Sequence, residues 1–150
     1  RGDPAFLKLP KPDVPGLDFS FSGLKTAFLY ALKARLKEDP DFIAKHLADL
    51  CASAQHRIVT ALLDKFFAAA EATGLRQLGV VGGVSANSYL RRLFAERCAA
   101  TGCEGFITRP AYATDNAAMI ALTGYHQFLK GDVTNHYMAC FAAEDVHQGA

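Results

Sequence analysis

The chain has 150 residues, of which 51% are hydrophobic, and a formal net charge of +1. This near-neutral charge argues against a module that binds nucleic acid through its own basic field, and no apolar run is long enough to cross a bilayer. The polar start, Arg1-Gly2-Asp3-Pro4, does not resemble a signal peptide. The four cysteines have no metal-type spacing, which predicts reduced thiols. We therefore expect a soluble, cytoplasmic globular unit or part of one.

The first 38 residues divide into an extended segment and a helix. Prolines at positions 4, 10, 12 and 15 exclude a helix there and predict a connector over residues 1–16. From Ser22, apolar residues recur every four positions until Asp39-Pro40 interrupts the pattern. A second, longer helix is expected from Asp39-Pro40 to Gly74, and its length suggests that it packs across a sheet.

The remainder alternates between strands and helices. The predicted elements are a strand at Leu78 to Val81, a helix at Ser88 to Thr101, a strand at Gly105 to Thr108 and a helix at Asp115 to Lys130. This order indicates an α/β fold with parallel strands. Two or three short strands cannot complete a doubly wound domain. We therefore expect the sheet to continue outside this chain or in residues 18–21.

Charged groups on the predicted helices have a simple interpretation. Arg91, Arg92 and Arg97 fall close together on one helix, which favours a solvated helix face. His46 and His56 are ten residues apart on the long helix, so they are expected to be solvated or edge residues rather than a metal pair.

Two strand-to-helix junctions carry the candidate chemistry. The first contains Gly82-Gly83 and Asn87, and the second contains Thr114 and Asp115. Glycine permits close approach of a ligand, and free N–H groups at a helix start favour phosphate. If the strands are neighbours, both junctions lie at the carboxyl edge of the sheet, where open α/β sheets bind ligands. The pair suggests a nucleotide cleft that Asn87 and Asp115 could both face.

Each of these two polar residues has two possible roles. Asn87 precedes a helix and suits an N-cap, but its amide can also donate and accept towards a ribose or a base. Asp115 can cap the last helix, which would stabilise it by about 1 kcal/mol, or it can ligate a metal. Spacing alone leaves both alternatives open.

Three motifs in order resemble one family: residues 17–26 (LDFSFSGLKT), residues 82–87 (GGVSAN) and residues 114–121 (TDNAAMIA). The chain resembles the tRNA adenosine threonylcarbamoyltransferases, formerly described as O-sialoglycoprotein endopeptidases, from about residue 1 to residue 130. The resemblance implies an actin-like, sugar-kinase-like (ASKHA) fold of two α/β lobes. This chain would be part of the C-terminal lobe, with residues 17–130 as the domain portion and residues 131–150 as a divergent tail.

The resemblance also implies an activity and its cofactors. Full-length members transfer a threonylcarbamoyl group from threonylcarbamoyl-AMP to the adenosine 3′ of the anticodon, in tRNAs reading codons that begin with adenine. By motif, Asn87 corresponds to a nucleotide-contacting residue, with threonylcarbamoyl-AMP or ATP as the bound nucleotide, and Asp115 to a ligand of iron or zinc. The family's histidine ligands and phosphate loops would lie outside this chain, so the isolated fragment is expected to be inactive.

The implied partners are tRNA, a smaller actin-like paralogue and a P-loop ATPase. Three rival functions are also considered. Gly83 to Asn87 approaches the G-x-S-x-G elbow of a serine hydrolase, with Ser85, Asp115 and His126 in the order of a triad. A non-catalytic actin-like scaffold and a sugar or acetate kinase of the same superfamily are the other two. Lys25 has no assigned chemical role.

Overall fold

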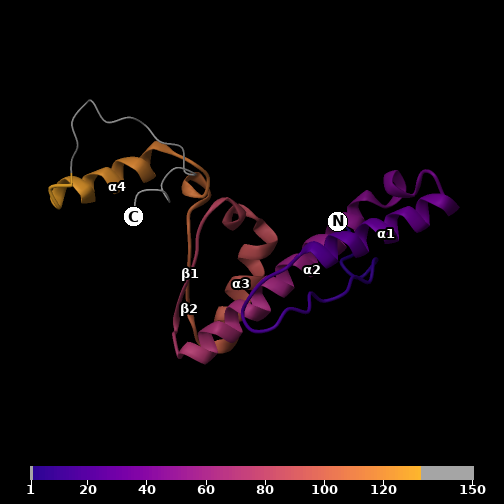
Figure 1. Cartoon of the computed structure of the whole chain (residues 1–150), viewed down its shortest axis with the longest axis horizontal. Coiled ribbons are helices and arrows are strands. Elements are labelled where there is room, and N and C mark those ends of the chain that lie inside the picture. The colour runs from indigo at the N-terminus through magenta and orange to yellow at the C-terminus, as the bar shows by residue number, and fades with distance from the viewer. Residues whose placement is uncertain (1, 133–150) are drawn as a thin grey trace, which may run out of the picture. The chain divides into compact units, whose positions relative to one another are not determined.

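A computed structural model describes residues 2–132 of the chain. The chain divides into two compact units, Arg1–Ala113 and Thr114–Ala150, and each unit is described by itself. The first unit contains helices α1 and α2, strand β1, helix α3 and strand β2, and the second contains helix α4 (Figure 1). Their bounds are α1 Ser22–Glu38, α2 Phe42–Thr73, β1 Gln77–Val80, α3 Ser88–Thr101, β2 Glu104–Ile107 and α4 Ala117–Leu129. No helix within residues 2–132 is both long and apolar enough to span a membrane.

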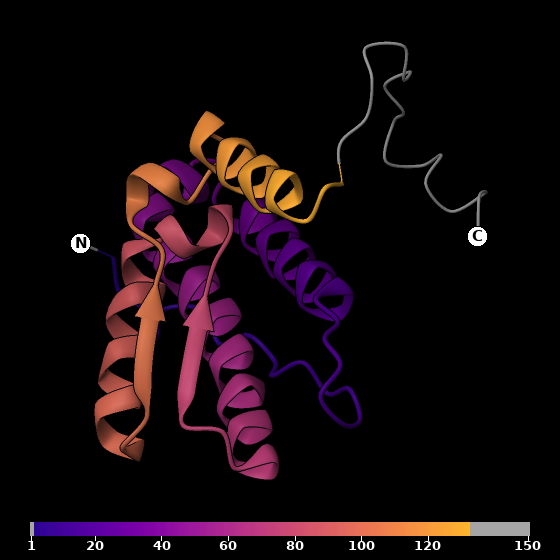
Figure 2. The same cartoon turned by 90° about the vertical axis from the view of Figure 1, so that its left-hand side faces the viewer.

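The two strands are neighbours and run parallel, as expected. Gln77 lies opposite Glu104, and Val80 lies opposite Ile107. Helices α2 and α3 cover one face of this pair (Figure 2). The core beneath that face is formed by Val59, Leu63, Ala70, Leu78, Leu90, Phe94 and Cys98. The prediction that the long helix packs across a sheet is therefore confirmed.

Local signals explain where the helices of the first unit end. Gly74 and Gly102 follow α2 and α3 with φ values of 70° and 68°, a left-handed conformation that glycine adopts without a steric penalty. Helix α2 begins two residues after Pro40, and the Asp39 side chain accepts a hydrogen bond from the Asp41 N–H at 3.0 Å. His46 has non-helical dihedrals (φ −120°, ψ 19°), so α2 is kinked near its start.

The N-terminal arm, residues 2–20, contains no helix or strand. It nevertheless docks along α2. The Leu7 N–H donates to Ser53 Oγ at 3.0 Å, and Lys65 Nζ donates to the carbonyls of Val14, at 2.7 Å, and Asp18. The absence of a helix from residues 2–16 confirms that the prolines exclude one, and residues 18–21 add no strand to the sheet. The boundary between a connector and a domain at residue 16 stays a prediction.

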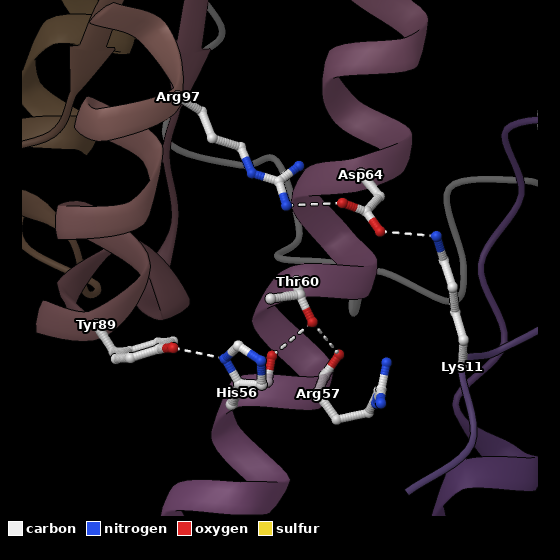
Figure 3. A network of polar contacts seen from close by, with 7 residues as sticks. All are labelled: Lys11, His56, Arg57, Thr60, Asp64, Tyr89 and Arg97. Carbon is white, nitrogen blue, oxygen red and sulfur yellow. Dashed lines mark hydrogen bonds and ion pairs between the residues drawn. The ribbon is translucent and has the colours of Figure 1, made fainter. Parts of the chain in front are cut away.

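Polar contacts join the arm and α3 to the middle of α2 (Figure 3). Asp64 of α2 pairs with Lys11 at 2.8 Å and with Arg97 of α3 at 2.7 Å. Partial burial tends to raise the pKa of Asp64, but hydrogen bonds from Lys11 and Arg97 outweigh it and leave that pKa below its ordinary value. His56 Nδ1 lies 2.6 Å from Tyr89 Oη. His56 is therefore half-buried against α3, which fits the edge alternative rather than the solvated one.

The second unit consists, within the described residues, of α4 and the turn before it. Helix α4 begins at Ala117 instead of Asp115 and is followed by Gly131 with φ 74°. Its apolar side chains are largely exposed, among them Ile120, Leu122, Phe128 and Leu129. The predicted divergent tail, residues 131–150, lies almost entirely outside the described residues.

Candidate functional site

The carboxyl ends of β1 and β2 lie at one edge of the sheet, because the strands are parallel neighbours. After β1 the chain turns at Gly82, whose φ of 85° favours glycine. It then forms a 3-10 turn, Gly83–Ala86, which leads into α3. After β2, the Thr108 N–H donates to the Val80 carbonyl at 3.2 Å. The two exit segments, residues 81–87 after β1 and residues 108–113 after β2, therefore start side by side.

Asn87 joins the 3-10 turn to α3. Its Oδ1 accepts a hydrogen bond from the Leu90 N–H at 3.0 Å, so the capping alternative is confirmed. Within residues 2–132 its Nδ2 has no hydrogen-bond partner. As the capping residue, Asn87 is held in a fixed orientation by its Oδ1, and its Nδ2 can still donate a hydrogen bond to a ligand.

Ser85 lies in the same turn but points inward. The residue is 0% exposed, and its Oγ has no hydrogen-bond partner among the described residues. A nucleophile must reach its substrate and be hydrogen-bonded to a base, and Ser85 meets neither condition. The serine hydrolase hypothesis is therefore not supported by this geometry.

Arg91 connects the two exit segments, a role that sequence analysis missed. Its Nη1 donates to the carbonyl of Ser85 at 3.0 Å and to the carbonyl of Thr108 at 2.8 Å. The interpretation of Arg91, Arg92 and Arg97 as one solvated face was wrong for two of the three, because Arg91 and Arg97 are half-buried and bonded to other segments. Only Arg92 is exposed, where it pairs with Glu96.

One feature of the sequence could have indicated this role for Arg91. The residue occupies the first turn of α3, where the helix dipole disfavours a positive charge. An arginine in that position needs acceptors elsewhere, and the two carbonyls provide them.

Asp115 lies in the second unit, just before α4. It does not cap that helix, because Asn116 is the N-cap and its side chain accepts from the Met119 N–H at 3.1 Å. Asn116 Nδ2 also donates to the Thr114 carbonyl at 2.8 Å. The capping alternative for Asp115 is therefore wrong, and its exposed carboxylate is left for another role.

A metal ion would find one suitable ligand in this region. The Asp115 carboxylate is a hard oxygen donor that suits a divalent cation, but within residues 2–132 no group of three His, Cys, Asp or Glu side chains could hold a metal. The described residues could therefore fill at most a single position of a metal's coordination sphere in this region. Asn87 and Asp115 belong to separate units, so their common pocket stays a prediction.

The first motif, residues 17–26, lies apart from these residues along the chain. Leu17 to Phe21 line a hollow of about 500 Å³ between the arm and α2, together with Asp64 and Lys65. Asp64 already pairs with Lys11 and Arg97, and Lys65 already donates to carbonyls of the arm. The hollow is therefore best explained as the space left where the arm docks on α2. Lys25 is exposed on α1 and has no assigned role.

Comparison with known proteins connects these features to a family. The family model described as tRNA N6-adenosine threonylcarbamoyltransferase matches residues 1–122. Relatives with that name include proteins of Porphyromonas gingivalis, 49% identical over 132 residues, and Christiangramia forsetii, 48% identical over 132 residues. Each alignment covers 88% of this chain and 39% of the relative.

A relative from Anaeromyxobacter is 48% identical over 135 residues, with the same coverage. The chain thus spans about two fifths of the length of the curated relatives it matches. The family match extends over both strand-to-helix junctions and all three motifs, up to residue 122. The chain therefore belongs to the tRNA N6-adenosine threonylcarbamoyltransferase family.

Proposed function

We propose that this chain is the C-terminal part of an enzyme that transfers a threonylcarbamoyl group from threonylcarbamoyl-AMP to the adenosine 3′ of the anticodon. The tRNAs concerned read codons that begin with adenine. The observation that carries the proposal is the family match over residues 1–122. Rival functions, a scaffold paralogue and a sugar or acetate kinase, find no support in the names of the relatives.

The fold belongs to the same proposal. An actin-like architecture of two lobes would place a nucleotide and a metal ion between them, with residues 17–130 in the C-terminal lobe. The parallel pair β1 and β2, with α2 and α3 on one face, supports this proposal. So does the share of each relative that is matched, 39%, because a full actin-like fold needs both lobes.

Asn87 is proposed to contact the nucleotide. Its Oδ1 is engaged with the helix, so the group that it offers is Nδ2, a donor suited to a ribose hydroxyl or a base acceptor. The cap holds the side chain in one conformation, which lowers the entropy lost when a ligand binds. The position at the carboxyl edge of parallel strands is where α/β sheets bind such ligands.

Asp115 is proposed to ligate the divalent metal, iron or zinc. The N-cap of α4 is Asn116, so the Asp115 carboxylate does not accept a capping hydrogen bond from that helix. This supports the role, because the carboxylate is not occupied by a cap. When bound, such an ion would supply Lewis-acid stabilisation of the negative charge that develops on the carbamoyl oxygen as the tRNA amine attacks the carbamoyl carbon and AMP leaves. Asp115 contributes one anionic ligand and helps to fix the position of the ion.

The partners and location are part of the proposal as well. We expect tRNA as the substrate, and a smaller actin-like paralogue and a P-loop ATPase as bacterial partners, in the cytoplasm. The described residues provide one carboxylate ligand and no three-residue metal group. The chain on its own is therefore expected to be inactive.

The test uses a chimera in which this chain replaces the matching segment of the Porphyromonas gingivalis relative. Threonylcarbamoyl transfer to unmodified tRNA and bound metal are measured with the partner proteins present. Asp115→Ala should abolish both transfer and bound metal. Asn116→Ala is the matched control, because it removes the true cap and should cost about 1 kcal/mol of stability while metal stays bound.

For Asn87, the aspartate variant separates capping from ligand contact. Asn87→Asp keeps an oxygen acceptor for the Leu90 N–H but lacks the amide donor. It should weaken nucleotide binding without destabilising α3. Asn87→Ala should weaken nucleotide binding and also destabilise α3, because it removes both the donor and the acceptor. An inactive wild-type chimera, or full metal retention by Asp115→Ala, would contradict the assignment.

A further inference from the structure

Arg91 makes an unusual pair of contacts for a helix residue. One nitrogen, Nη1, donates to two backbone carbonyls, Ser85 at 3.0 Å and Thr108 at 2.8 Å. Neither carbonyl belongs to α3. Ser85 lies in the turn that follows β1, and Thr108 is the first residue after β2. The guanidinium therefore ties together the two segments that leave the carboxyl edge of the sheet.

These segments need an external restraint. The Thr108 N–H bond to the Val80 carbonyl, at 3.2 Å, links the segment after β2 to the last residue of β1. The turn itself is held by two backbone bonds, from the Ser85 N–H to Gly82 and from the Asn87 N–H to Val84, at 2.9 and 3.0 Å. Charge-assisted hydrogen bonds from a half-buried guanidinium are stronger than neutral ones, so Arg91 is suited to fix the turn against the second strand.

We propose that Arg91 is a positioning residue of the nucleotide site: by holding the carbonyls of Ser85 and Thr108, it fixes the Asn87 turn against the segment that leads towards Asp115. This inference rests on the proposed function, because it assigns Arg91 to the same nucleotide site. Arg91 touches neither substrate nor metal in this role. Its effect is to keep the turn that carries Asn87 in its binding conformation before the ligand arrives.

The first test measures amide hydrogen exchange by NMR on the 150-residue chain. In Arg91→Gln, exchange at Ser85, Asn87 and Thr108 should accelerate by about tenfold, because their segments lose a shared anchor. Arg92→Gln is the matched control, since Arg92 is the adjacent helix residue and is exposed. Unchanged exchange at the three amides in Arg91→Gln would overturn the proposal. An equal acceleration throughout α2 would also overturn it, because that is the signature of general destabilisation.

The second test measures kinetics in the chimera described above. Arg91→Gln should raise KM for threonylcarbamoyl-AMP by about tenfold while kcat changes by less than about threefold. Arg91→Lys should give an intermediate KM, because its shorter ammonium can still donate to one carbonyl. An active wild type with an unchanged KM in Arg91→Gln would refute the positioning role alone. A wild-type chimera without transfer activity would refute the proposed function, and the positioning role with it.

Discussion

Gly105 of β2 is a position in the core where a single added methyl group should destabilise the fold. A Cβ built there would lie 2.8 Å from Cys98 Sγ and 2.8 Å from Phe94 Cε1. Both partners are buried, at 5% and 2% exposure. The Phe94 ring is further confined by Phe66 and Phe67, with centroids 5.9 and 6.0 Å away. Neither neighbour can therefore move aside freely.

The expected magnitude follows from two opposing effects of Gly105→Ala. Overpacking a well-filled core costs about 1–3 kcal/mol, whereas the loss of glycine's freedom in the unfolded chain returns about 0.4–1 kcal/mol. The free energy of unfolding should therefore fall by about 1.3 kcal/mol at the midpoints of these ranges, and by about 2.6 kcal/mol at most. Urea denaturation followed by circular dichroism measures it directly.

Gly79 of the neighbouring strand provides the control. A Cβ at Gly79 meets no atom within 4 Å, so Gly79→Ala should be neutral or slightly stabilising. A double variant with Cys98→Ala tests the contact itself, because Cys98→Ala should cost less stability when Ala occupies position 105. If Gly105→Ala proves as stable as Gly79→Ala, the proposed close packing of β2 against α3 is refuted.

Three further predictions concern the core, an ion pair and the thiols. Leu63→Ala should lower the free energy of unfolding by about 2–5 kcal/mol in urea denaturation, because Leu63 is 1% exposed within the core. The pKa of Asp64 is held below its ordinary value of 3.8, so the stability it contributes is present above that pH and is lost as pH falls further. The difference in unfolding free energy between wild type and Asp64→Asn should accordingly shrink in urea titrations below pH 3.8. Burial, with Cys103 as a second cause, raises the pKa of the Cys98 thiol, so peptide mapping after iodoacetamide treatment should find exposed Cys51 alkylated well before Cys98.

Local rules explain how much of the architecture was predictable. The ends of α2 and α3 follow from Gly74 and Gly102, because only glycine takes a left-handed conformation without cost. The predicted α3 has the observed bounds, Ser88–Thr101, and the two strands are each displaced by one residue. Periodicity also indicated that α2 covers the sheet, since its apolar face needs a partner.

The candidate site was only partly predictable, because local rules identify which residues can cap a helix but not which of two neighbours will do so. Capping by Asn87 is a local contact and was foreseen as one alternative. The choice of Asn116 over Asp115 as the cap of α4 depended on which residue adopts the extended conformation, φ −154° and ψ 154°, at the helix start. Both residue types are good caps, so composition alone could not decide between them.

The sequence by itself determined the family, through three ordered motifs, and the order of helices and strands, through short-range preferences of the backbone. The tertiary structure alone decided what the charged residues do. Arg91 and Arg97 share a helix with exposed Arg92, yet their partners are Thr108 and Asp64 on other segments. Such pairs depend on which surfaces the folded core brings together, and no local pattern around an arginine encodes the carbonyl or carboxylate that will lie opposite it.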